Sequence, residues 1–232
     1  MKLTILGNNG PYPSIGGATS GYLLQANNKN YVLDFGSGCL ANLQRHVDLS
    51  EIEAIILTHL HFDHISDLGV LAYYMQVNKI GKIKLYIPEI NDYVSMLLKT
   101  GFFTCVVYGS GEVNINGETI IATKMKHPVL SYALTFKEKD KTFSYTGDTT
   151  LCEEVEQVFK NSNVVLCDTA FLKEKWTEKL PHLNIYDACK IAQDNNVKII
   201  LTHITAKITK EELLKEAFGN YIVSKINESY KI

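Results

Sequence analysis

The sequence predicts a layered α/β domain in which β-sheets are covered by helices. Two patterns indicate this fold class: short apolar segments typical of strands recur along the whole chain, and segments with apolar residues at three- and four-residue spacing, typical of helices, lie between them. The chain has 232 residues, of which 46% are hydrophobic, and no linker or low-complexity tract divides it. We therefore expect residues 1–232 to form a single domain.

The predicted strands fall into two groups. The first group, near the amino terminus, is bounded by glycine and asparagine turns and is expected at residues 3–6, 22–25 and 31–34. The second group is more continuously apolar, as strands of covered sheets are, and is expected at residues 54–57, 84–87, 119–125, 131–136, 143–146, 164–167 and 198–201. Helices are expected at residues 66–77, 93–98, 152–160, 185–194 and 210–218. The charged run at residues 137–141 predicts a hairpin turn.

Composition excludes several classes of function. The chain carries 23 basic and 25 acidic residues, and Arg45 is its only arginine, so a nucleic-acid binder that acts through bulk positive charge is not expected. No amino-terminal segment has the pattern of a signal peptide, and no stretch approaches the roughly 20 apolar residues of a membrane helix, so no membrane partner is expected. The five cysteines are scattered and never spaced as C-x-x-C, which predicts a protein of the reducing cytoplasm.

The densest group of polar side chains is the segment 58–64, which directly follows an apolar strand. It places the imidazoles of His59, His61 and His64 and the carboxylate of Asp63 within six residues. Three histidines at the end of an apolar strand would leave several ring nitrogens without partners, and metal binding removes that problem. His59 and His61 project to one side of an extended loop, whereas Asp63 and His64 fall at the start of the next helix. Two differently directed pairs predict two metal ions.

Further candidate ligands stand where other predicted strands end, and they are His127, Asp148 and His203. The same pentapeptide occurs at residues 55–59 and 199–203, and His203 is the last residue of its second copy. The repeat suggests that two strands from different halves of the fold end at the same place. Each residue also has a simpler interpretation, as a turn residue, a helix cap and a loop residue in that order. Together with the first cluster they make seven candidate ligands, enough for two metals if Asp148 bridges them.

The sequence resembles the metallo-β-lactamase superfamily, whose hallmark H-x-H-x-D-H is present as His59, His61, Asp63 and His64. Further segments, at residues 7–24, 32–36, 127, 145–149 and 201–203, fall in the order that this family uses. The resemblance implies a four-layer αββα sandwich with a dizinc site at one edge. It also implies how the ligands are divided: His59, His61 and His127 on one ion, Asp63, His64 and His203 on the other, and Asp148 shared.

Within the superfamily, the segments 147–149, 167–171 and 181–184 look like the ribonuclease Z branch. This resemblance implies that Asp168 and His182 support proton transfer to the leaving group; the alternative is that His182 only caps the helix that begins at Ile185. Long-arm members of the branch insert an extended tRNA-binding arm between the ligands matching His127 and Asp148, but here only twenty residues separate the two. The chain therefore looks more like the small, arm-less phosphodiesterase-type hydrolases.

We expect a dinuclear metal-dependent hydrolase that cleaves phosphodiesters such as cyclic nucleotides or short RNA. In this scheme a hydroxide between the metals attacks phosphorus, Asp63 orients it, and His182, held by Asp168, donates a proton to the leaving oxygen. Two divalent ions per chain are expected; zinc is the first choice, with manganese and iron as alternatives, because imidazole and carboxylate ligands accept all three. A homodimer is a family expectation. Two alternatives stay open, a lactone or thioester hydrolase and a non-catalytic metal-bound regulatory module.

Asp34 is a further candidate because it stands at the end of an apolar strand. Its carboxylate could accept the free N–H of a ligand histidine, as acidic residues behind metal ligands do. The alternative is a turn aspartate before Gly36.

Overall fold

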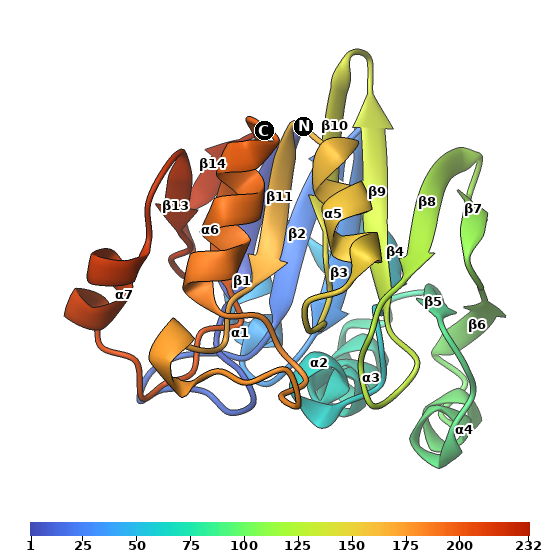
Figure 1. Ribbon diagram of the computed structural model, residues 1–232. Coiled ribbons are helices and arrows are strands. Elements are labelled where there is room, and N and C mark those ends of the chain that lie inside the picture. Colours follow the sequence, from blue (N-terminus) through green and yellow to red (C-terminus); the bar gives the residue numbers. More distant parts are fainter.

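The computed structural model describes residues 1–232 and contains two β-sheets packed face to face (Figure 1). The strands of the first sheet are β1 (Lys2–Gly7), β2 (Gly21–Ala26), β3 (Lys29–Phe35), β4 (Ile52–Ile56), β5 (Ile83–Ile87), β6 (Phe103–Val107) and β14 (Ser229–Lys231). The strands of the second are β7 (Gly111–Ile115), β8 (Glu118–Lys124), β9 (Tyr132–Glu138), β10 (Lys141–Tyr145), β11 (Val164–Asp168), β12 (Lys198–Thr202) and β13 (Tyr221–Val223). The sheet orders are β14-β1-β2-β3-β4-β5-β6 and β13-β12-β11-β10-β9-β8-β7.

Helices cover the outer face of each sheet. The α-helices are α1 (Cys39–Leu43), α2 (Phe62–Ile65), α3 (Asp67–Asn78), α4 (Asp92–Lys99), α5 (Glu153–Lys160), α6 (Ile185–Asp194) and α7 (Lys210–Glu216), and 3-10 turns lie at Leu49–Glu51 and Lys173–Lys175. Figure 1 shows α5 and α6 lying over the second sheet. One apolar cluster fills the space between the sheets, and one lies under the helices on each outer side. The predicted four-layer αββα sandwich is confirmed. None of the helices combines the length and the apolar character needed to cross a membrane.

Every predicted strand and helix is present, with ends displaced by no more than two residues. The predicted hairpin turn is also confirmed, since β9 and β10 pair as an antiparallel hairpin around residues 139–140. The elements that were not predicted are α1, β6, β7, β13, β14 and the two 3-10 turns, and α2 was not predicted as a helix separate from α3. β6 and β7 lie at sheet edges and are partly exposed, so they lack the buried pattern by which strands are recognised, and β13 and β14 have only three residues each.

The direction of the strands determines where their following loops meet. In the second sheet, β8 and β10 both run antiparallel to β9, while β10, β11 and β12 are mutually parallel. The carboxyl ends of β8, β10, β11 and β12 therefore lie at one edge of this sheet. The twenty residues between His127 and Asp148 contain only β9, β10 and their connections, so the chain has no arm at this position.

Candidate metal centre

Seven polar side chains, all predicted from the sequence as metal ligands, come together at this edge. His59 and His61 lie on the loop after β4, and Asp63 and His64 lie on α2. The others follow β8, β10 and β12 and are His127, Asp148 and His203. Their donor atoms form two groups in which all atoms lie within 4.8 Å of one another, and Asp148 is a member of both groups. Matching ends of β4 and β12 thus reach one place, as the repeated pentapeptide indicates.

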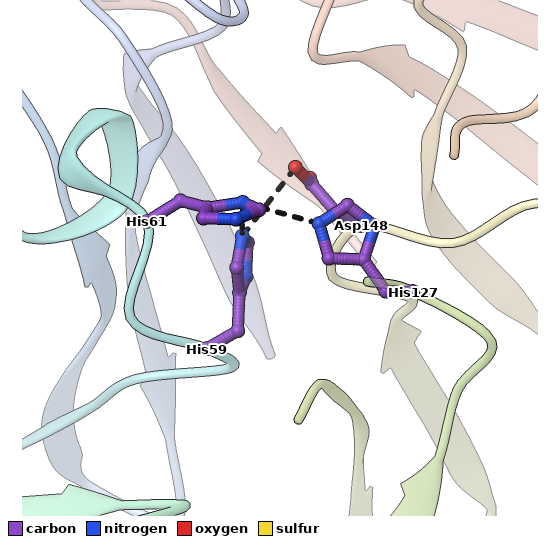
Figure 2. Close-up of side chains that lie close together, drawn as sticks. All are labelled: His59, His61, His127 and Asp148. Atoms are coloured by element: carbon purple, nitrogen blue, oxygen red, sulfur yellow. Dashed lines mark hydrogen bonds and ion pairs between the residues drawn. The ribbon is translucent and has the colours of Figure 1, made fainter. Parts of the chain in front are cut away.

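The first group joins His59, His61, His127 and Asp148 (Figure 2). His61 Nδ1 lies 3.1 Å from His59 Nε2 and 3.1 Å from His127 Nε2. The Asp148 carboxylate lies 3.5 Å from His59 Nε2. Burial is the first cause that lowers the pKa of all three histidines. These rings are therefore neutral near pH 7, with lone pairs available to a cation.

The second group joins Asp63, His64, His203 and the same Asp148. Asp148 Oδ2 lies 3.2 Å from His64 Nε2 and 3.3 Å from His203 Nε2. Asp63 Oδ2 lies 3.5 Å and 3.1 Å from the same two nitrogens. One oxygen of Asp148 is thus within 3.5 Å of histidines from both groups, which is the position expected of a shared ligand.

Three of these histidines use their second ring nitrogen in hydrogen bonds that point away from the centre. The Nδ1 of His64 donates to Asp34 at 2.8 Å, that of His127 donates to the carbonyl of Pro181 at 3.1 Å, and that of His59 lies 3.0 Å from the hydroxyl of Thr58. A proton held on Nδ1 leaves a lone pair on Nε2, the nitrogen that faces the other candidate ligands. Such outer partners are typical of metal-binding histidines.

The residues present fit divalent cations. Nitrogen atoms that carry lone pairs face one another at 3.1 Å, a close approach that an ion between them would stabilise. Two buried polar atoms of the second group, His64 Nε2 and Asp148 Oδ1, also have no hydrogen-bond partner. Buried polar atoms are rarely left unpaired, so these atoms indicate a ligand between the side chains. A set of imidazoles and carboxylates is suited to zinc, manganese or iron.

The charges around the centre also favour cations. Burial lowers the pKa of His64, but the surrounding carboxylates, with Asp148 the strongest, raise it well above its ordinary value. Burial also lowers the pKa of His203, but the surrounding carboxylates, with Asp148 the strongest, raise it to about 10. Burial raises the pKa of Asp148, but the neighbouring imidazoles, led by His203, lower it well below the usual range. The negative potential that attracts protons to these histidines would also attract divalent ions.

Asp34 lies behind the second group and is completely buried. Its carboxylate accepts hydrogen bonds from Thr58 N at 2.7 Å, and from Thr58 Oγ1, His64 Nδ1 and Tyr145 Oη at 2.8 Å each. Of the two interpretations drawn from the sequence, the acceptor for a histidine N–H is the one that the structure shows. Asp34 therefore fixes the direction in which His64 presents its other nitrogen.

Replacing Asp34 with asparagine is expected to weaken metal binding about 10- to 100-fold, the usual cost of losing an outer partner of a metal ligand. The physical reason is that an amide NH2 would face donors of Thr58 or His64 where a carboxylate oxygen now accepts. Titration of metal-free protein against a chromophoric chelator measures this affinity. Asp67→Asn is a suitable control, because Asp67 also accepts a backbone hydrogen bond, from Leu40 at 2.8 Å. An Asp34→Asn protein with unchanged metal affinity would contradict the assignment.

Asp168 and His182 form a third group next to the first two. Asp168 Oδ2 accepts from His182 Nδ1 at 2.8 Å, and His182 Nδ1 lies 3.7 Å from Asp148 Oδ2. The His182 ring stacks on that of His203, with centroids 4.8 Å apart. Burial lowers the pKa of His182, but Asp168 raises it above its ordinary value. The residue that caps α6 is Asn184, whose side chain accepts from Asp187 N, so His182 does not serve as the cap.

Two residues at this edge were not identified from the sequence. Trp176, the only tryptophan, donates from Nε1 to the carbonyl of His182 at 2.8 Å and thereby holds the segment that carries this histidine. Gly10 lies against the ring of His203, and a Cβ at this position would overlap that ring. A lone tryptophan in a polar stretch and a glycine in a glycine-rich turn are weak signals, because each occurs for many structural reasons.

Comparisons with known proteins agree with this geometry. Residues 29–204 match a family described as the beta-lactamase superfamily domain. The chain is 28% identical over 225 residues to the probable metallo-hydrolase YhfI of Bacillus subtilis (strain 168), which covers 94% of this chain and 92% of that protein. The crystal structure of YhfI superimposes with a TM-score of 0.90 at 26% identity, over 99% of this chain and 98% of that one. The chain is also 26% identical to a ribonuclease Z of Sulfolobus acidocaldarius, over 94% of this chain and 92% of that protein.

Proposed function

Because the chain belongs to the metallo-β-lactamase superfamily and is similar to ribonuclease Z-like hydrolases of that family, we propose that it is a dinuclear phosphodiesterase. The observation that supports this most is the convergence of seven side chains in two groups that share Asp148. We assign His59, His61 and His127 to one ion and Asp63, His64 and His203 to the other. Zinc is the proposed metal, and residues 1–232 are proposed to act as one domain.

Divalent cations held by these side chains would act as Lewis acids on the phosphate and lower the pKa of the attacking water towards 7. The chain itself supplies orientation and proton transfer. Asp63 is half-buried, and it is ionised because His64 and His203 lower its pKa in spite of burial, so it can orient the attacking water. His182, with Nδ1 bonded to Asp168, has Nε2 left to donate a proton to the leaving oxygen.

The pair of Asp168 and His182 favours a phosphodiester over a carbonyl substrate. Cleavage of a diester expels an alkoxide, a poor leaving group that benefits from a proton donor. A lactone or thioester hydrolase is the second candidate: a thioester releases a thiolate that needs less help, and a metal ion could itself stabilise the oxygen that leaves a lactone. A non-catalytic regulatory module is the least supported, because such a module has no need for a histidine and aspartate pair beside the ligands.

The proposed substrates are small and anionic, such as cyclic nucleotides or short RNA. The β9–β10 hairpin occupies the position of a tRNA-binding arm, and the chain has one arginine, so a large RNA surface is not proposed. We further propose a homodimer located in the cytoplasm, where the five free cysteines would remain reduced.

Elemental analysis combined with a substrate panel tests the proposal. Purified protein is expected to hold two divalent ions per chain, and to hydrolyse phosphodiesters such as bis(p-nitrophenyl) phosphate and 2′,3′-cyclic nucleotides faster than matched lactones and thioesters. A chelator should abolish the activity, and zinc or manganese should restore it. Preference for a lactone or thioester would support the second candidate instead, and a metal-free protein would contradict both.

A further inference from the structure

A small hollow opens directly beside the first group of candidate ligands. Its volume is about 240 Å³, and its walls include Lys126, His127, Glu178, Lys179 and Pro181. His127 belongs to both the hollow and the ligand cluster, so anything bound in the hollow lies next to the proposed reaction site. The pockets that bind whole ligands have volumes of about 300–1,000 Å³, so this hollow is the right size for one part of a substrate.

The hollow is formed by two segments that are joined by hydrogen bonds. His127 Nδ1 donates to the Pro181 carbonyl at 3.1 Å and thereby joins the segment after β8 to the segment before α6. Thr150 N donates to the Lys126 carbonyl at 3.1 Å and fixes the same stretch from the other side. Two prolines, Pro128 and Pro181, line the hollow and restrict the backbone further. The hollow therefore exists before any substrate binds.

The charged groups of the hollow are available to a ligand. Five other lysines form ion pairs with carboxylates, but neither Lys126 nor Lys179 does. Glu178 is the one acidic residue among the walls, and it too forms no ion pair. Among the walls themselves, two ammonium groups face one carboxylate. Outside the walls, hydrogen bonds and, after them, the nearby Lys126 ammonium group lower the pKa of Glu154. Lysine is suited to phosphate as a mobile point charge that can reach several of its oxygens.

We propose that this hollow binds a second phosphate group of the substrate, attached on the sugar next to the phosphodiester that is cleaved. The inference rests on the proposed phosphodiesterase function and narrows its substrate class to diesters that carry a neighbouring phosphomonoester. Lys126 and Lys179 hold this second phosphate, and the wall formed by His127 places the scissile diester at the metal centre. These lysines are specificity-determining residues, because they contact a part of the substrate that does not react.

A matched pair of chromogenic substrates tests the inference: thymidine 5′-(p-nitrophenyl phosphate) with and without a 3′-phosphate. Wild-type protein loaded with zinc should show the lower KM for the 3′-phosphorylated ester. In Lys126→Ala/Lys179→Ala we expect this KM to rise about five- to twentyfold, the effect of two solvent-exposed ion pairs, with kcat unchanged. The KM for the unphosphorylated ester should stay within about twofold. Glu178→Gln should shift the KM for the phosphorylated ester in the opposite direction, because it removes a repulsive charge.

Lys137→Ala/Lys141→Ala is the control, since these two exposed lysines lie on the β9–β10 hairpin, at the end of the sheet away from the ligand loops (Figure 1). It removes the same total charge and should leave both KM values unchanged. If the wild type cleaves both esters with equal KM, or if the two double variants behave alike, the inference is wrong and the phosphodiesterase function stands. If the zinc-loaded wild type cleaves neither ester, the proposed function itself is overturned, and the inference with it.

Discussion

Asp148→Asn is expected to lose both metal ions, whereas Asp63→Asn is expected to lose one. Asp148 Oδ2 lies 3.5 Å from His59 in the first group and 3.2 Å and 3.3 Å from His64 and His203 in the second. Asp63 approaches only the second group, at 3.5 Å and 3.1 Å. Asparagine keeps the size of the side chain but removes the charge. The difference between the two variants therefore reports which carboxylate is shared.

The expected loss in kcat/KM for Asp148→Asn exceeds about a hundredfold. Mutating even a residue that only hydrogen-bonds a metal ligand lowers metal affinity or activity about 10- to 100-fold, and Asp148 is proposed as a ligand itself. Metal content per chain, measured after gel filtration, is the direct measurement. Thermal unfolding gives a second one: an ion at a hundred times its Kd stabilises by about 2.7 kcal/mol, or about 5–10 °C in Tm for a chain of this size. Because the wild type is expected to bind two ions, zinc should raise its Tm by about twice this amount and leave that of Asp148→Asn unchanged. Two ions retained by Asp148→Asn would show that the carboxylate is not a bridge.

Most of the candidate site could be predicted because four of its seven residues form a dense cluster in a short stretch of sequence. His59, His61, Asp63 and His64 fall within six residues after an apolar strand, and a structural role for so many imidazoles is hard to find. The other candidate ligands, His127, Asp148 and His203, each follow a strand. The carboxyl ends of strands that run in the same direction lie at one edge of a sheet. The same reasoning gave the layers of the fold, since buried strands and amphipathic helices have clear periodicities.

The details that orient these side chains could not be predicted. Asp34 and His203 both adopt positive φ angles, 53° and 55°, which residues other than glycine rarely do. Such backbone strain costs about 1–3 kcal/mol for each residue. It persists because surrounding contacts, which only the folded chain provides, hold the residue in this conformation. The hydrogen bond from Trp176 to His182 is likewise a contact between loops, and no periodic pattern encodes it. The sequence therefore indicates which residues gather, whereas tertiary packing decides how they face one another.

His182→Ala is expected to slow cleavage of an unactivated phosphodiester about 10²- to 10⁴-fold, the usual contribution of a general acid. The side chain lies where this role requires it, with its Nδ1 bonded to Asp168 at 2.8 Å and its ring against His203. Burial lowers its pKa and the Asp168 carboxylate raises it, with a net increase, which favours the protonated ring that can act as a donor. The measurement is kcat for a 2′,3′-cyclic nucleotide, whose leaving group is a sugar hydroxyl.

The same variant should cleave bis(p-nitrophenyl) phosphate at nearly the wild-type rate, because p-nitrophenolate leaves without a proton. The ratio of the two rates thus separates proton donation from a general loss of structure, which would lower both. Asp168→Asn should reproduce the leaving-group dependence more weakly, since the imidazole remains but loses the carboxylate that holds and charges it. Equal losses on both substrates, with metal content unchanged, would mean that His182 positions the substrate and that the leaving oxygen takes its proton from water.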